Sequence, residues 1–148
     1  MENPGKDIRW RQRFQNFRRA FCLLREALEG RDVESYSALE QEGVIQRFEY
    51  TFELGWKTFK DYLEHNGVLF PEATPRKVIK ECAATGVFAE AGINGEAWLE
   101  MMLARNALSH MYDFTLFTEV IAKIKNKFFP ELEREFQFLL AKEQEPDA

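Results

Sequence analysis

VIQRFEYTFELGWKTFKDYLEH, residues 44–65, decides the fold class of this chain. Its large apolar residues recur every three or four positions, which is the period of one face of an α-helix. They are Ile45, Phe48, Phe52, Trp56, Phe59 and Leu63. A stripe of this kind becomes buried when it packs against other helices. The stretch therefore predicts a long amphipathic helix over residues 37–65.

The same period recurs on both sides of this stretch, and no run alternates as a strand would. A first helix is predicted from about Asp7 to Leu28, with one narrow stripe of apolar residues. The stripe consists of Trp10, Phe14, Phe17, Phe21, Leu24 and Leu28. Three further helices are predicted over residues 74–86, 95–109 and 115 into the 130s. Thr74 suits a cap and Pro75 a first turn, whereas Pro130 is expected to bend the last helix.

Long amphipathic helices joined by short turns bury their stripes most simply against one another. We therefore expect an all-α fold, an antiparallel up-and-down bundle of four to five helices that forms a single domain over residues 1–148. The 148 residues are 45% apolar and 14% aromatic, which is enough for one substantial core. The acidic tail after about residue 142 is expected to fray.

Composition and motifs exclude several classes of function. The net charge of −5 is wrong for a basic nucleic-acid coat protein. Cys22 and Cys82 lie far apart and the chain has two histidines, so neither a disulfide framework nor a metal site is expected, and no cofactor is indicated. No apolar run approaches the roughly 18 residues of a membrane span. We expect a reduced, cytoplasmic protein without membrane contact.

Common catalytic motifs are also absent from the sequence. It has no P-loop, no dinucleotide-binding glycine pattern, no nucleophile elbow and no zinc-protease motif. It also lacks a Gly-Ser turn followed by paired aspartates, which a nucleotidyl-transfer site uses to hold magnesium and a triphosphate. The chain is therefore not expected to be a nucleotidyltransferase itself.

Basic residues crowd into the first predicted helix. Seven of them fall between residues 6 and 25, against Asp7 alone: Lys6, Arg9, Arg11, Arg13, Arg18, Arg19 and Arg25. Arg11, Arg18 and Arg25 are seven residues apart, so they share one side of the helix. Such a run is usually a solvated surface. The alternative is a strip that faces phosphate groups.

The stretch MLARNALSHMYD, residues 102–113, sets polar groups inside or just beyond a very apolar helix. Buried polar groups are costly unless they are paired, so this cluster is unlike packing filler. Arg105 offers a fixed cation for a phosphate, and His110 offers a group that moves a proton near neutral pH. These two are our candidate catalytic residues.

Helix geometry restricts this hypothesis. On a straight helix Arg105 and His110 point about 140° apart. They converge only if the helix ends near Ser109 or if two protomers contribute. The structural alternative is a helix end capped by the side chains of His110 and Asp113.

A second constellation lies in the opening stretch. Glu49, Glu53 and Lys57 recur every fourth residue along the margin of the apolar stripe. They form either a stabilising surface ladder or a set of carboxylates that orients Arg105 across the bundle. Gly55 costs about 1 kcal/mol against Ala in mid-helix, which indicates a neighbour packed closely there.

Three blocks of this sequence resemble the nucleotidyltransferase substrate-binding protein family, which belongs to the HEPN superfamily and is related to HepT-type toxins. The blocks are residues 44–57, residues 74–79 (TPRKVI), and Trp98-Leu99 followed by Arg105-Asn106 and by residues 109–113 (SHMYD). The resemblance covers Phe14 to Phe128. Taken in order, the three blocks are fairly specific to the family.

The resemblance implies an HEPN-like bundle that forms a homodimer, with the Arg and His of both protomers near a shared cleft. It also implies a separately encoded minimal nucleotidyltransferase as partner, in a toxin–antitoxin-like pair that assembles as a heterotetramer. In HepT-type relatives the Arg and His serve metal-independent RNA cleavage, and the partner attaches AMP to the Tyr. Those positions here are Arg105, His110 and Tyr112.

The remaining candidates are supporting or ligand-binding residues for RNA or a nucleotide. They are Asn106, Asp113, Arg47, Glu49, Glu53 and Lys57. The sequence departs from the family pattern at two positions. Phe114 stands where an acidic residue often follows, and Gly55 stands where relatives often carry Ala. Two functions stay open: a partner subunit that presents Tyr112 or a bound nucleotide, and a ribonuclease toxin that uses Arg105 and His110.

Overall fold

A computed structural model of the chain describes residues 4–109 and 114–145, and within these ranges it is helical with no strand. The α-helices are α1 (Pro4–Leu28), α2 (Ala38–His65), α3 (Pro75–Ala84), α4 (Val87–Ala91), α5 (Gly95–Leu108), α6 (Phe117–Lys123) and α7 (Phe129–Gln144). Short 3-10 turns cover Val33–Ser35 and Phe114–Leu116, and a π-helical turn covers Ile124–Phe128. The predicted all-α class is confirmed.

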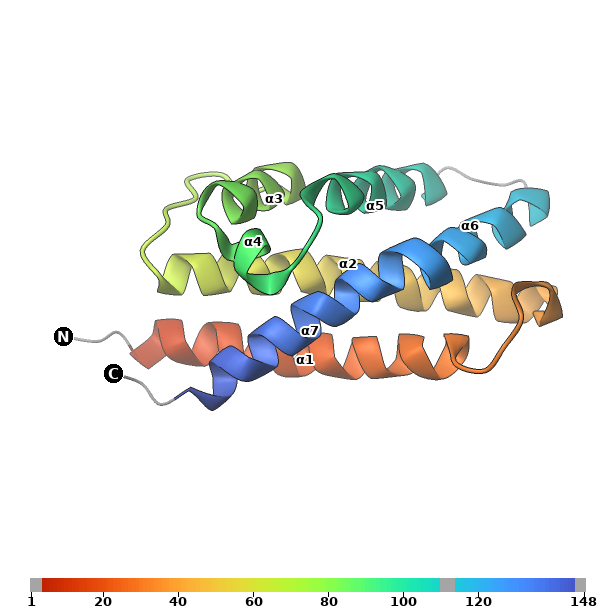
Figure 1. The fold of residues 1–148 in the computed structure, drawn as a ribbon, viewed down its shortest axis with the longest axis horizontal. Helices are drawn as coiled ribbons and strands as arrows, with labels where there is room; N and C mark the ends of the chain where they lie inside the picture. Colours follow the sequence, from red (N-terminus) through yellow and green to blue (C-terminus); the bar gives the residue numbers. More distant parts are fainter. Residues whose placement is uncertain (1–3, 110–113, 146–148) are drawn as a thin grey trace.

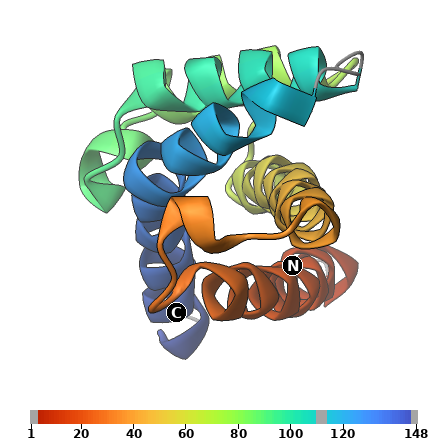
Figure 2. The same ribbon diagram turned by 90° about the vertical axis from the view of Figure 1, so that its right-hand side faces the viewer.

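The helices form four antiparallel rods, as Figure 1 shows, and each rod is called a leg below. The four legs are α1, α2, α3 with α5, and α6 with α7. α1 and α2 lie side by side and run in opposite directions. α3 and α5 follow one another along the third leg, with α4 set below them, and α6 and α7 return along the fourth. Viewed from one end, α7 closes the bundle between the α1–α2 pair and the α3–α5 layer (Figure 2).

Three helices begin at caps that the sequence provides. Ser37 forms a full capping box with Glu40 at the start of α2, and Thr74 accepts a hydrogen bond from the backbone N–H of Lys77 at the start of α3. Pro75 occupies the first turn, where its missing N–H costs nothing, as predicted. The side chain of Asn94 accepts two backbone N–H groups of α5.

The helices in the second half of the chain are interrupted more often than the spacing of apolar residues predicted. The predicted loop after Gly86 contains α4, which is enclosed by Gly86 and Gly92 at φ angles of 86° and 71°. The last predicted helix is interrupted by the π-helical turn at Ile124–Phe128, directly before Pro130. Pro130 cannot donate to the carbonyl four residues earlier, which lies inside that turn. α7 then continues to Gln144, two residues beyond the point at which we expected fraying.

Aromatic side chains fill the core between the legs. All six residues of the predicted α1 stripe and all six of the predicted α2 stripe are buried. Phe136 of α7 stacks on Phe14 and Phe21 of α1, with ring centroids 5.9 and 4.9 Å apart. Cys82 is buried in this core, whereas Cys22 is only half-buried at its edge.

Side chains from three other helices closely approach the backbone of α2 at Gly55. A Cβ at this position would lie 2.6 Å from Oε1 of Glu135 in α7, 3.2 Å from Phe17 in α1 and 3.3 Å from Trp98 in α5. Three other legs therefore meet the α2 backbone at one residue. The close neighbour that the mid-helix glycine indicated is confirmed, and Glu135 is a member of it that the sequence did not single out.

Glu135 is a carboxyl group inside an apolar core. The residue is fully buried, and neither carboxyl oxygen has a hydrogen-bond partner in the described part of the chain. Burial disfavours the charged form and raises the pKa of Glu135 well above its ordinary value.

Exchange of Gly55 for Ala tests the close approach. Gly55→Ala adds helix propensity but places a methyl group against Glu135, Phe17 and Trp98, and overpacking of this kind costs about 1–3 kcal/mol. We expect urea unfolding to show a lower free energy of unfolding than in the wild type. Gly43→Ala is the matched control, because nothing lies within 4 Å of a Cβ there. It should gain about 0.5–1 kcal/mol from propensity, and an equal gain from Gly55→Ala would contradict the packing.

Exchange of Glu135 for Gln tests the buried acid. The folded pKa is raised, so the wild type binds one more proton than its unfolded chain above about pH 4.3 and loses about 1.4 kcal/mol of stability per pH unit until the folded pKa is passed. Glu135→Gln has no such slope, so its stability relative to the wild type should improve as the pH rises. Exposed Glu133 on the same helix supplies the control, Glu133→Gln, which should show no comparable trend.

Candidate functional site

Arg105 occupies a core-facing position of α5. Trp98, Met101, Met102 and Leu108 lie three, four or seven residues away on the same face, and all four are buried. The Arg105 side chain keeps 35% of its surface exposed, because it lies near the end of the helix. A cation on the buried face of a helix requires a partner on the helix opposite.

Glu53 of α2 is that partner. Nη2 of Arg105 donates to Oε2 of Glu53 at 3.1 Å, across 52 residues of sequence. Nε1 of Trp56 donates to the same oxygen at 3.2 Å, and Nζ of Lys57 lies 3.2 Å from Oε1. The carboxylate is thus held from three directions, and it fixes the position of the Arg105 guanidinium.

Trp56 belongs to this site as well as to the core. Its ring is almost completely buried, and Nζ of Lys57 lies 5.8 Å from the ring centroid. The sequence pattern predicted only a core position for Trp56. The signal that was available is the indole N–H, which needs an acceptor when it is buried and has a glutamate three residues earlier.

Glu49 lies one helical turn before Glu53 and is half-buried. Partial burial raises the pKa of the Glu49 carboxyl, and the positive charge of Arg105 opposes that rise. The site therefore holds two carboxylates, Glu49 and Glu53, against two cations, Arg105 and Lys57. Its own charges are balanced.

Two other candidates differ in their distance from this cluster. Oδ1 of Asn106 accepts a long contact of 3.5 Å from Nη1 of Arg105, so it borders the site. Arg47 faces the other neighbour of α2, because its Nη1 donates to the backbone carbonyl of Leu23 in α1 at 2.8 Å. The structure brings Glu49, Glu53, Lys57, Arg105 and Asn106 together and places Arg47 elsewhere.

His110, Tyr112 and Asp113 lie outside the described residues, so their convergence with Arg105 stays a prediction. α5 ends at Leu108, and Ser109 is its C-terminal cap, with Oγ donating to the carbonyl of Asn106 at 2.7 Å. An end at this position is what convergence of Arg105 and His110 within one protomer requires. Capping of α5 by His110 or Asp113 is equally untested.

The chemistry open to the described part of the site is binding and charge stabilisation. A guanidinium has five N–H donors, and two of its nitrogens are engaged here, so Arg105 keeps donors for an anionic or hydroxyl-bearing ligand. Within the residues that the structure describes, no three His, Cys, Asp or Glu side chains could together hold a metal ion. No helix in those ranges is long and apolar enough to cross a membrane.

Comparison with known proteins identifies the family. The family model described as nucleotidyltransferase substrate binding protein like matches residues 12–141, which include every described residue of the site, and the chain belongs to this family. No curated protein matches the sequence. The match does not extend to the HEPN superfamily, so that placement and the relation to HepT-type toxins stay predictions.

Titration of Glu49 tests the electrostatics of this site. Arg105→Gln removes the positive charge that stabilises the Glu49 carboxylate, so the pKa of Glu49, already raised, should rise further. The pKa can be followed by NMR of the Glu49 carboxyl carbon at low ionic strength. Arg47→Gln removes the same charge from α2 but on the side of α1, and it should leave the pKa unchanged. An equal shift in both variants would show that Arg105 has no special proximity to Glu49.

Proposed function

We propose that this member of the nucleotidyltransferase substrate binding protein-like family is the partner subunit of a separately encoded minimal nucleotidyltransferase. The observation that carries the proposal is the contact of Glu53 with Arg105 at 3.1 Å. Two sequence blocks that resemble the family, far apart in the chain, meet there in one partly exposed cluster. That cluster offers binding groups of both charges, which suits a subunit that holds a substrate for another enzyme.

A homodimer is part of this proposal, and the composition of α5 supports it. The helix is apolar on its outer face as well as its inner one, since Leu99, Leu103 and Ala107 follow each other at intervals of four. Leu103 is 55% exposed. A row of exposed apolar side chains on a helix is normally covered by a partner. A second copy packed on this face would cover Leu103 and Ala107.

Tyr112 is the proposed acceptor of AMP. In this step the phenol oxygen attacks the α-phosphate of ATP bound to the partner and forms a new P–O bond. The bond from the α-phosphorus to the bridging oxygen breaks, pyrophosphate leaves and the phenol proton passes to solvent. Magnesium and the triphosphate belong to the partner's site, because this chain has no sequence motif for them. The cluster of Glu53 and Arg105 would hold the partner or its nucleotide beside the tyrosine, because Arg105 precedes Tyr112 by only seven residues.

A metal-independent ribonuclease that uses Arg105 and His110 is the competing function. There Arg105 would stabilise the charge on the phosphorane while His110 transfers a proton. The ion pair with Glu53 counts against it, because an RNA phosphate would have to compete with a carboxylate already bound to the guanidinium. The partner function does not require Glu53 to release the guanidinium of Arg105.

Co-expression with a small nucleotidyltransferase from a neighbouring reading frame tests the proposal. We expect the two chains to purify together, and incubation with ATP should add one or more AMP units to this chain by mass spectrometry. Tyr112→Phe should abolish the added mass, whereas Tyr50→Phe, at an exposed tyrosine of α2, should not. Continued modification of Tyr112→Phe would place the acceptor elsewhere.

Growth on expression of this chain alone separates the two functions. The partner function predicts no arrest. Arrest that both Arg105→Ala and His110→Ala relieve would establish the ribonuclease instead. Wild-type behaviour of the double variant in growth, co-purification and modification would show that these residues are structural.

A further inference from the structure

Several arginines of α1 lack the carboxylate partners that most other cations of this protein have. Arg18, Arg19 and Arg25 are exposed, and none of them has a carboxylate partner among residues 9–109 and 115–145. Carboxylates hold most other cations of the bundle, for example Arg13, Arg31, Lys60, Arg105, Lys127 and Lys142. In a chain with 25 acidic residues, an unpaired set of this kind is a local excess of positive charge.

Arg18 and Arg25 lie over the aromatic edge between α1 and α7. The guanidinium carbon of Arg18 is 5.8 Å from the ring centroid of Phe136, and that of Arg25 is 5.7 Å from Phe21. These two rings stack at 4.9 Å, and Phe21 also stacks on Phe129 at 5.1 Å. Seven residues of helix place the two arginines about 10 Å apart along the axis. Cation and ring thus alternate along one edge of α1, on the side where α7 packs.

A cavity of about 430 Å³ adjoins Arg25 at the end of this edge. The residues that line it include Arg25, Lys125 and Phe129, together with Glu29 and Glu133. The volume falls within the range of small-molecule sites, roughly 300–1,000 Å³. The lining combines an aromatic ring, two cations and two hydrogen-bond acceptors.

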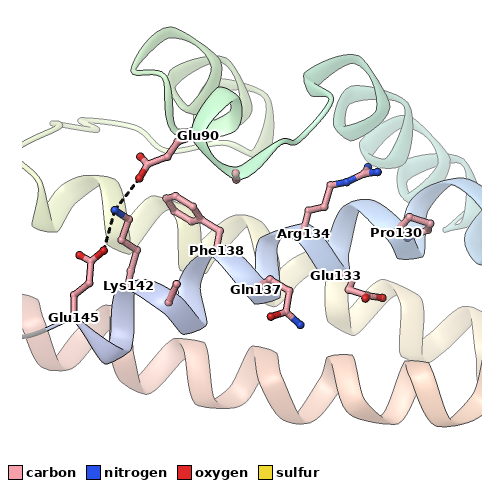
Figure 3. Close-up of a pocket in the computed structure, with 10 residues that line it drawn as sticks. Glu90, Pro130, Glu133, Arg134, Gln137, Phe138, Lys142 and Glu145 are labelled. Carbon is pink, nitrogen blue, oxygen red and sulfur yellow. Dashed lines mark hydrogen bonds and ion pairs between the residues drawn. The ribbon is translucent and has the colours of Figure 1, made fainter.

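A larger cavity between α4 and α7 provides a contrast, and Figure 3 shows it. It has a volume of about 570 Å³, but its cations are already neutralised. Lys142 lies between Glu90 at 2.9 Å and Glu145 at 3.4 Å, and Arg134 is bound to Glu131. An anion entering there would have to displace carboxylates, whereas Arg25 carries no such partner.

We propose that the cavity beside Arg25 binds a nucleotide unit, with the base against Phe129 and the phosphate on the Arg25–Arg18 edge. Guanidinium groups suit phosphate because they donate parallel hydrogen bonds to two of its oxygens. Aromatic rings alternating with arginines are the usual platform for nucleobases and for the backbone of a single strand.

The two carboxylates of the cavity narrow the ligand further. Glu29 and Glu133 would repel a bare phosphate or an acidic peptide. They accept hydrogen bonds from amino groups, however, and carboxylates read the amino edge of a base in this way. The ligand therefore carries its negative charge at one end and a planar, amino-bearing group at the other. Adenosine and cytidine nucleotides meet this description better than uridine nucleotides.

Fluorescence anisotropy with labelled oligonucleotides tests the inference on the full chain. Short adenosine oligoribonucleotides should bind more tightly than uridine ones of the same length, and their affinity should fall as salt increases. Arg18→Gln and Arg25→Gln should each weaken binding about tenfold, as loss of one charged hydrogen bond does. Arg19→Gln is the matched control, since Arg19 is also exposed and has no carboxylate partner within the described ranges, but points about 100° away from Arg18.

Two further binding measurements identify the ligand. Competition with AMP identifies the source of the nucleotide: AMP that competes as well as the oligonucleotide assigns the site to a free nucleotide, and a much tighter oligonucleotide assigns it to a strand. Glu133→Gln should reduce the preference for adenosine over uridine. Circular dichroism of each variant should match the wild type, because the exchanged side chains are exposed.

Three results would overturn the inference. The first is no measurable binding by the wild type, and the second is an equal loss in Arg19→Gln, which would show non-specific attraction. The third is loss of binding in Arg105→Ala with Arg25→Gln unaffected, which would place the nucleotide at the α2–α5 site. The first two results leave the proposed partner function untouched, and a failure to purify with a nucleotidyltransferase leaves this inference untouched.

Discussion

The close approach of three legs to the backbone of Gly55 is the constraint on which the rest of the structure depends. Phe17, Trp98 and Glu135 reach this one residue from α1, α5 and α7. Protein interiors are packed as densely as organic crystals, so a contact of this kind fixes the distance and the rotation of each helix. Glu53 and Trp56 are neighbours of Gly55 in the same turn of α2, so the packing that fixes Gly55 also fixes them.

The candidate site results from this packing and from one polar residue, Arg105, on the otherwise apolar inner face of α5. α5 presents apolar residues to the core at every position of its inner face except Arg105. The cation is accommodated because the packed position of α2 brings Glu53 within hydrogen-bond distance. Trp56 stabilises the arrangement, since its buried indole N–H and the guanidinium share one carboxylate oxygen. The exposed part of Arg105 keeps its remaining donors available to a ligand.

Two carboxyl groups near Gly55, those of Glu53 and Glu135, have different surroundings. Glu53 is charged, partly exposed and held by three donors, whereas Glu135 is enclosed and has no hydrogen-bond partner within the described ranges. The first arrangement orients the guanidinium of Arg105. The second reduces stability whenever the pH favours ionisation, and it occupies the space that the missing side chain of Gly55 leaves. The two carboxyl groups lie on either side of the same helical turn.

The sequence by itself determined the fold class, the long helices and their buried faces, because each follows from the spacing of apolar residues along one segment. It also determined the cap at Thr74 and the close neighbour of Gly55, which are local or steric requirements. It identified Glu49, Glu53 and Arg105 as candidates, but it could not choose between a surface ladder and a partner for Arg105. That choice depends on how α2 and α5 are rotated, and no local pattern contains this information.

Only the tertiary structure decided which residues share a site and which do not. It separated Arg47 from Glu49, although they are two residues apart, because a helix turns by about 100° per residue and the two face different neighbours. It placed Glu135 against Gly55 and gave Trp56 a role beyond packing. The structure has α6, a π-helical turn and α7 where one helix was predicted. The sequence did not reveal this, because the effect of Pro130 depends on how the neighbouring backbone accommodates the hydrogen bond that proline cannot donate. Contacts between segments far apart in the chain are set by the packing of whole helices, and for this reason the sequence pattern did not reveal them.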